Sequence, residues 1–165
     1  MRSTALVRIP VGVVVERRAA KSKWADYLWR PVSVLIGTPA AAPWTPIDTT
    51  PEATLFYAGE ATIELHRTET VYYRDNITSD APTLWAVLQP AFSEFPYRVL
   101  SVTADPGEGE AFTDGGDNIV EALPMPAEVL ETVRQFIVDH HVERPFRKRR
   151  RTPSDALGPE TDTGQ

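Results

Sequence analysis

The side chains best suited to acid–base chemistry in this sequence gather at residues 64–69. Glu64 and His66 are two positions apart in an alternating stretch, so both point from one face of a strand, and Glu69 follows shortly after. A histidine oriented by a carboxylate can act as a base, which makes Glu64, His66 and Arg67 the candidate catalytic residues. The alternative interpretation is a cross-strand salt bridge or a hydrogen-bonded surface histidine, and we favour it because such pairs are common on sheets.

The other titratable groups do not have the spacing of a metal site. His140 and His141 are neighbours in a predicted helix, where adjacent side chains point about 100° apart. The acidic residues of the predicted loop 105–117 lack the alternating ladder, glycine and terminal glutamate of a calcium loop. We therefore predict no metal ligand set, and a solvated turn in the acidic loop.

Several classes of chemistry have no residues to carry them. The chain has no cysteine, which excludes disulfides, thiolate nucleophiles, zinc fingers and protein-held iron–sulfur clusters. No Gly-Lys-Ser/Thr phosphate loop and no Gly-x-Ser-x-Gly nucleophile elbow occurs. We expect no cofactor, and a binding or accessory role is favoured over an enzyme.

The most conspicuous charged feature is a basic run near the C-terminus. Six of the 17 Lys and Arg residues lie in 144–151, and the remaining 11 stand against 23 acidic residues. An acidic body is a poor platform for nucleic acid. The run either forms a solvated helix exit or clamps an acidic partner or RNA, with Phe146 as its anchor. The candidate partner-binding residues are Trp24, Tyr27, Trp29, Phe146, Arg147, Lys148, Arg149, Arg150 and Arg151.

The apolar patterns predict an α+β fold in residues 1–146. Expected strands are 5–18 and 24–37 as a hairpin, 53–58 and 61–67 as a hairpin across Gly59 and Glu60, then 83–88, 97–104 and 118–123. A proline-rich extended connection covers 38–52, a short helix is expected at 69–78 and a turn or short helix at 106–114, and a final helix starts at Pro126. Its predicted buried face is Val129, Val133, Phe136, Ile137 and His140. The predicted architecture is an antiparallel, meander-like sheet of about six strands with the C-terminal helix packed on one face.

The chain ends in a segment that cannot bury enough apolar surface to order itself, so residues 147–165 are expected to be a disordered tail, basic and then acidic. The apolar run 11–15 is too short for a signal-peptide core or a membrane helix. We therefore expect a cytoplasmic protein without a membrane-spanning segment.

Several motifs together resemble one known family. They are Ile9-Pro10-Val11-Gly12-Val13-Val14-Val15-Glu16-Arg17-Arg18, Trp24-x-x-Tyr27-x-Trp29-x-Pro31-Val32, Phe56-Tyr57-Ala58-Gly59, Glu64-Leu65-His66-Arg67-Thr68-Glu69-Thr70, Val120-Glu121-x-x-Pro124-Met125-Pro126 and His140-His141-Val142-Glu143-x-Pro145-Phe146. They are similar to the proteobacterial domain-of-unknown-function family 3305. The similarity covers nearly everything before residue 150.

The resemblance implies a context rather than a mechanism. Members tend to be encoded beside molybdenum-dependent formate dehydrogenase subunits and their assembly factors, and some carry labels tying them to molybdopterin-guanine dinucleotide synthesis. The nucleotidyltransferase of that synthesis has a Gly-rich loop after its first strand, whereas Val15 here is followed by Glu16-Arg17-Arg18-Ala19-Ala20. We expect a non-catalytic accessory protein that binds a molybdoenzyme subunit or maturation factor. The alternatives are a cofactor-handling enzyme of molybdopterin-guanine dinucleotide metabolism and an RNA-binding module.

Overall fold

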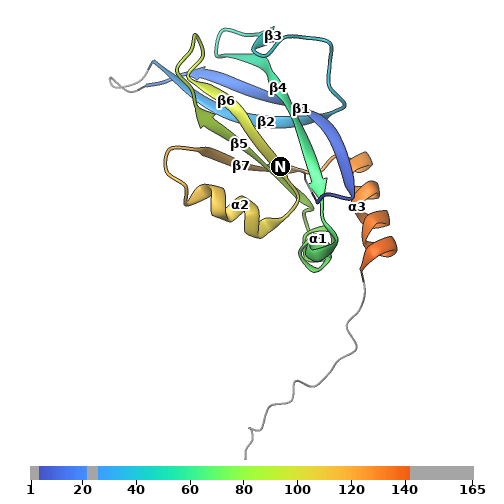
Figure 1. The fold of residues 1–165 in the computed structure, drawn as a ribbon. Helices are drawn as coiled ribbons and strands as arrows, with labels where there is room; N and C mark the ends of the chain where they lie inside the picture. The colour runs from blue at the N-terminus through green and yellow to red at the C-terminus, as the bar shows by residue number, and fades with distance from the viewer. Residues whose placement is uncertain (1–3, 22–25, 142–165) are drawn as a thin grey trace, which may run out of the picture.

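Seven strands and three α-helices make up the part of the chain that the computed structural model describes, residues 4–21 and 26–141. The strands are β1 (Val7–Ala19), β2 (Tyr27–Ile36), β3 (Thr45–Thr49), β4 (Ala53–Leu65), β5 (Thr83–Pro90), β6 (Tyr97–Thr103) and β7 (Ile119–Pro124). The helices are α1 (Thr70–Ile77), preceded by the 3-10 turn η1 (Arg67–Glu69), α2 (Pro106–Thr113) and α3 (Ala127–His140). The predicted α+β class is confirmed (Figure 1).

The strands form two antiparallel sheets, so the predicted single sheet of about six strands is wrong. The first sheet has the order β2-β1-β4-β3 and the second the order β6-β5-β7. After β4 the chain turns away through η1 and α1, and β5 therefore starts a new sheet instead of extending the first (Figure 1). The two sheets face each other, with β4 close to β6 and β2 close to β7, and enclose a shared core.

The centre of β1 is buried on both faces, as its sequence predicts. Val11, Val13 and Val15 point into the shared core and have no exposed surface. On the other face the ring of Tyr57 lies so close to Gly12 that a Cβ there would meet it at 2.7 Å. A larger residue at position 12 would therefore displace the buried ring of Tyr57, and the valine-rich run is explained by burial on both sides.

The predicted hairpin across Gly59 and Glu60 is wrong, because β4 continues through these residues as one strand of 13 residues. Its partner β1 is equally long and pairs with it from Val7 to Arg18. Gly59 has φ of 150° beside a register shift opposite Val13 and Val14, so the strand bends at a bulge instead of turning back. A continuous partner strand decides between bulge and hairpin here, and local sequence does not contain that information.

Part of the proline-rich connection 38–52 is a strand, which the sequence analysis missed. β3 pairs with β4 at the edge of the first sheet and all five of its residues are exposed. Pro46 lacks the N–H that an interior strand would have to donate, so an edge is where this sequence can join a sheet.

Helices α1 and α3 pack together at one end of the core, beside the start of β1 and the end of β4 (Figure 1). The helical spacing correctly predicts that Val129, Val133 and Phe136 are buried, whereas Ile137 and His140, predicted on the same face, are only half-buried. The predicted position on one face of a single sheet is corrected, because α3 lies against α1 at the end of a two-sheet core. We call this region the helical end.

Candidate binding site

Six aromatic side chains and one arginine meet at the opposite end of the core, which we call the aromatic end. Its residues are Arg17, Tyr27, Trp29, Trp44, Phe56, Phe95 and Tyr97. Each lies near the end of a strand or in a loop beside it, since Arg17 precedes the end of β1 and Tyr27 begins β2. At about 3.3 Å per residue, Arg17 is roughly 30 Å along β1 from Val7 at the helical end.

Trp29 is at the centre of the aromatic end. Its ring centroid lies 5.6 Å from that of Trp44 and 6.2 Å from those of Phe56 and Phe95. Trp44 in turn stacks on Phe95 with centroids 4.9 Å apart and planes 9° from parallel. Edge-to-face and stacked ring pairs of this kind stabilise a structure by about 0.5–1.5 kcal/mol beyond the area that they bury. The rings therefore tie the β5–β6 loop to the first sheet.

The backbone of Trp44 adopts a conformation that side chains rarely take. Its φ is 67°, and it is the one non-glycine residue with positive φ in the described ranges. The left-handed region costs roughly 1–2 kcal/mol for a residue with a Cβ. The hydrogen bond from its N–H to the carbonyl of Tyr57 (2.6 Å) and the ring contacts with Phe95 and Phe56 offset this strain.

Arg17 places a positive charge among these rings. Its guanidinium carbon lies 4.4 Å from the ring centroid of Tyr27 and 5.1 Å from that of Phe56. The neighbouring Arg18, on the other face of β1, instead forms an ion pair with Glu16 at 3.2 Å, and this hydrogen bond holds the pKa of Glu16 below its usual value. Among the described residues no carboxylate lies within ion-pair distance of Arg17.

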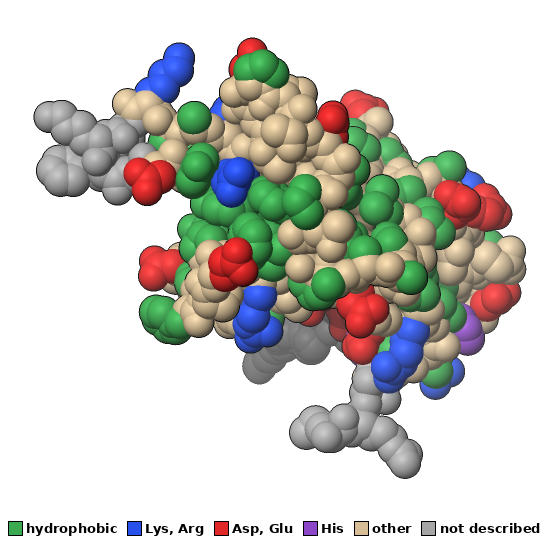
Figure 2. All heavy atoms as spheres, turned by 90° about the horizontal axis from the view of Figure 1, so that it is seen from above, with side chains coloured by type: hydrophobic (Ala, Val, Ile, Leu, Met, Phe, Trp, Pro, Cys, Tyr) green, Lys and Arg blue, Asp and Glu red, His purple; other side chains and the backbone are tan. Residues whose placement is uncertain are grey.

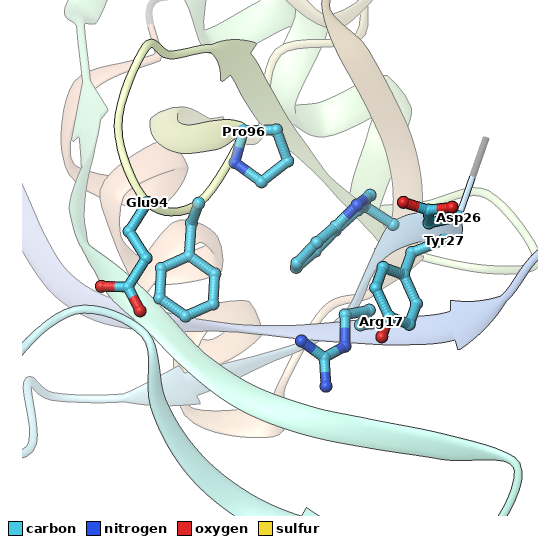
Figure 3. A pocket seen from close by; sticks show the side chains of 7 residues that line it. Arg17, Asp26, Tyr27, Glu94 and Pro96 are labelled. Carbon is cyan, nitrogen blue, oxygen red and sulfur yellow. The ribbon is translucent and has the colours of Figure 1, made fainter.

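A pocket of about 390 Å³ opens beside Arg17. Its lining residues are Arg17, Asp26, Tyr27, Trp29, Glu94, Phe95 and Pro96 (Figure 3). Asp26 and Tyr27 lie on one side and Glu94 and Pro96 on the other, so the pocket separates the start of β2 from the β5–β6 loop (Figure 3). Seen from above, the molecule presents hydrophobic side chains across the middle of this face, with charged side chains around them (Figure 2). The arrangement suits the binding of a partner's apolar and charged groups together.

The candidate catalytic group lies at the helical end, and its side chains contact one another. Nε2 of His66 is 3.5 Å from Oε1 of Glu64, whose other oxygen is 3.7 Å from Arg8. Nδ1 of His66 is 3.1 Å from the hydroxyl of Thr4. Arg67 is exposed and begins η1. Both ring nitrogens of His66 therefore have a partner from the same chain.

One comparison with known proteins gives a family. The family model described as a protein of unknown function, DUF3305, matches residues 10–150. The chain belongs to this family. No curated protein and no solved structure matches it.

Two of the predicted partner-binding residues of this DUF3305 chain, Tyr27 and Trp29, lie at the aromatic end. The others lie outside the described residues: Trp24, Phe146, Arg147, Lys148, Arg149, Arg150 and Arg151. Sequence reasoning missed Arg17 and Phe95. Alternation along β1 was the available signal for Arg17, because it shares a face with Val15 and Val13 and so points inwards.

Two kinds of feature are absent from residues 4–21 and 26–141. Within these ranges no helix is both long and apolar enough to span a membrane. No group of three or more His, Cys, Asp or Glu side chains in the same ranges is arranged to hold a metal ion.

Proposed function

We propose that the protein is a non-catalytic accessory protein in the assembly of a molybdoenzyme such as formate dehydrogenase, and that it binds an enzyme subunit or a maturation factor through its aromatic end. The observation that carries the binding role is the pocket in which Arg17, Tyr27, Trp29 and Phe95 meet at the surface. Aromatic residues and arginine are the types that dominate binding energy in protein interfaces. The molybdoenzyme context is supported by the family resemblance alone.

The runner-up function is a cofactor-handling enzyme of molybdopterin-guanine dinucleotide metabolism with Glu64, His66 and Arg67 at its site. The contacts of His66 with Thr4 and Glu64 favour the accessory role, because a base whose ring nitrogens are engaged by its own chain is poorly placed to take a substrate proton. An RNA-binding module is disfavoured by the excess of acidic over basic residues outside the basic run.

The basic run is proposed as a second, electrostatic contact to the same partner. Its residues lie outside the described ranges, so this part of the proposal rests on sequence. Replacing residues 147–151 with serine should reduce capture of the partner most strongly at low salt, because exposed charges are screened as ionic strength rises. Capture that does not change across a salt titration would remove the run from the proposal.

The molybdoenzyme role is tested by complementing a deletion strain and measuring formate dehydrogenase activity. We expect wild-type protein and the His66→Gln variant to restore activity equally, because glutamine keeps a polar side chain of similar reach and removes only the acid–base group. Loss of activity in a folded His66→Gln protein that still captures its partner would favour the enzyme. Full activity without any form of the protein would overturn the molybdoenzyme role.

The binding role is tested by affinity capture with a matched pair of variants. Tyr27 is 44% exposed at the aromatic end, and Tyr72 is 50% exposed on α1 at the helical end. We expect Tyr27→Ala to reduce capture of a formate dehydrogenase subunit or maturation factor by about ten-fold or more, the effect of losing an interface hot spot. Tyr72→Ala should leave capture unchanged. Equal losses, or a loss with Tyr72→Ala alone, would contradict the assignment of the surface.

A further inference from the structure

The stacking of Arg17 on aromatic rings leaves the N–H donors of its guanidinium free of contacts with those rings. A guanidinium that lies over aromatic rings uses its faces for those contacts, while its N–H donors point outwards in the guanidinium plane. Tyr27 and Phe56 hold the group at 4.4 and 5.1 Å, which fixes its position before any ligand arrives. None of the side-chain hydrogen bonds and ion pairs seen in the described residues uses these donors. The group they fit is a carboxylate, which accepts two parallel N–H bonds from a guanidinium.

Two features argue against other charged ligands. A cation could pair with Asp26 or Glu94, but it would lie beside the like charge of Arg17, which also covers the ring of Tyr27. A phosphate or a nucleic acid strand would bring two or more negative charges between Asp26 and Glu94, which line the two sides of the pocket (Figure 3). Of the anionic groups, a single carboxylate is repelled least by Asp26 and Glu94, and it can still accept two N–H bonds from Arg17.

The walls of the pocket indicate what accompanies the carboxylate. Trp29, Phe95 and Pro96 present apolar surface next to Arg17, and the pocket of about 390 Å³ is large enough for more than one side chain. It lies between the start of β2 and the β5–β6 loop and is open to solvent, so a chain can pass through it without ending there. The occupant is then an internal acidic side chain with an aromatic residue or proline beside it.

We infer that the aromatic end binds an extended segment of the partner in which an Asp or Glu stands next to an aromatic residue or proline, with its carboxylate on the guanidinium of Arg17. The inference deepens the proposed function and rests on it for the existence of a protein partner. It assigns Arg17, rather than the basic run, as the residue that selects the partner's negative charge.

The test uses capped pentapeptides as probes of the full-length protein. The parent probe is Ser-Phe-Glu-Pro-Ser, and its central residue is replaced in turn by glutamine, lysine and phosphoserine. Binding is followed by NMR through the indole N–H of Trp29 and the Nε–H of Arg17, which detects weak complexes. We expect both signals to move with the glutamate peptide and its Kd to be at least about ten-fold lower than that of the glutamine peptide, the effect of a charge-assisted hydrogen bond.

Every other ranking of the peptides overturns the inference. Equal binding of the glutamate and glutamine peptides would show that Arg17 does not bind a carboxylate. Tighter binding of the lysine peptide would make Asp26 and Glu94 the binding groups, and tighter binding of the phosphoserine peptide would make the pocket a phosphate site. A single-stranded RNA oligonucleotide that moves the same two signals more than the glutamate peptide would favour the RNA-binding module.

A matched pair of variants tests the arginine itself. Arg17→Lys keeps the charge and loses the planar fork and its stacking, so the preference for glutamate over glutamine should fall to within about three-fold. Arg18→Lys makes the same change on the opposite face of β1 and should keep the full preference. A thermal melt checks that both variants fold. If Arg17→Lys unfolds, the peptide series on the unmodified protein still shows whether the pocket prefers a carboxylate.

The outcomes separate this inference from the proposed function. Loss of partner capture in Tyr27→Ala without any glutamate preference would keep the binding surface and remove the carboxylate. A glutamate preference that depends on Arg17, with partner capture unchanged in Tyr27→Ala, would keep the chemistry of the pocket and remove the proposed partner from it.

Discussion

The two ends of the core are closed by different kinds of contact. At the helical end, polar groups inside the structure are matched by partners from the same chain. Asn76, which is buried on α1, donates to the carbonyls of Thr83 and Ala104 at 2.8 and 2.9 Å and accepts from the N–H of Thr83 at 2.9 Å. The hydroxyl of Tyr73 accepts from the N–H of His66 at 2.9 Å. This end joins α1 to both sheets.

The aromatic end is closed by rings, and it holds a guanidinium whose donors are not used by the described residues. Ring contacts fix the positions of side chains without using hydrogen-bond donors, so the donors at the surface remain available to a ligand. The difference between the two ends shows that titratable side chains alone do not mark a binding site. His66 and Glu64 satisfy each other at the helical end, and Arg17 is the group still suited to bind.

The largest expected effect on stability is at the helical end, where Asn76→Ala removes three hydrogen bonds. The partners left behind are backbone groups in the interior, so we expect the free energy of unfolding to fall by about 3 kcal/mol. Urea denaturation measures the change. Asp75→Ala, an exposed neighbour on the same helix, should change stability by less than about 0.5 kcal/mol. A loss below about 1 kcal/mol for Asn76→Ala would show that water replaces these bonds.

At the aromatic end, Trp44→Ala should destabilise the protein by about 2 kcal/mol, because its ring is only partly buried. The positive φ of Trp44 gives a second expectation: Trp44→Gly should be less destabilising than Trp44→Ala by roughly 1 kcal/mol, since glycine adopts this conformation without strain. Thermal melts of the two variants compare them. An alanine variant as stable as the glycine variant would mean that the strain is absent.

Several helices and strands of the fold could be predicted from local sequence. The periodicity of α3 and the valines of β1 depend on neighbours in the chain, so both elements were predicted correctly. The bulge at Gly59 and the split into two sheets depend on which strands pair over long distances, and no local pattern contains that information. The site mixes the two cases, because Tyr27 is recognisable by type, whereas Arg17 lines a pocket only because the β5–β6 loop with Phe95 lies opposite it in the fold.

A smaller effect is the loss of stability at high pH that is expected from Tyr73 at the helical end. Burial raises the pKa of Tyr73 to about 12, above the usual value of about 10. The folded state therefore holds the phenolic proton more tightly, so the contribution is fully present below about pH 10 and is lost as pH rises towards 12. Between pH 9 and 11 the wild type should lose about 1.4 kcal/mol more stability than Tyr73→Phe. Parallel pH profiles for the two proteins would show that Tyr73 ionises as it does in the unfolded chain.

The smallest effect is expected for Phe92, an aromatic residue of the β5–β6 loop that is fully exposed and makes none of the ring contacts seen in the described residues. Phe92→Ser should change the free energy of unfolding by less than about 0.5 kcal/mol. This variant separates the ring cluster from aromatic content as such. A loss comparable to that of Trp44→Ala in urea denaturation would mean that Phe92 belongs to the cluster.

The aromatic end is proposed to bind the protein partner, and the helical end to stabilise the fold without contacting that partner. Hydrogen exchange measured by mass spectrometry, on the protein alone and in complex with its captured partner, tests this most directly. We predict that binding slows exchange in peptides that contain residues 26–29 and 94–97 and leaves peptides that contain residues 64–76 unchanged. Slower exchange at residues 64–76, with residues 26–29 and 94–97 unaffected, would contradict the claim and return attention to Glu64 and His66.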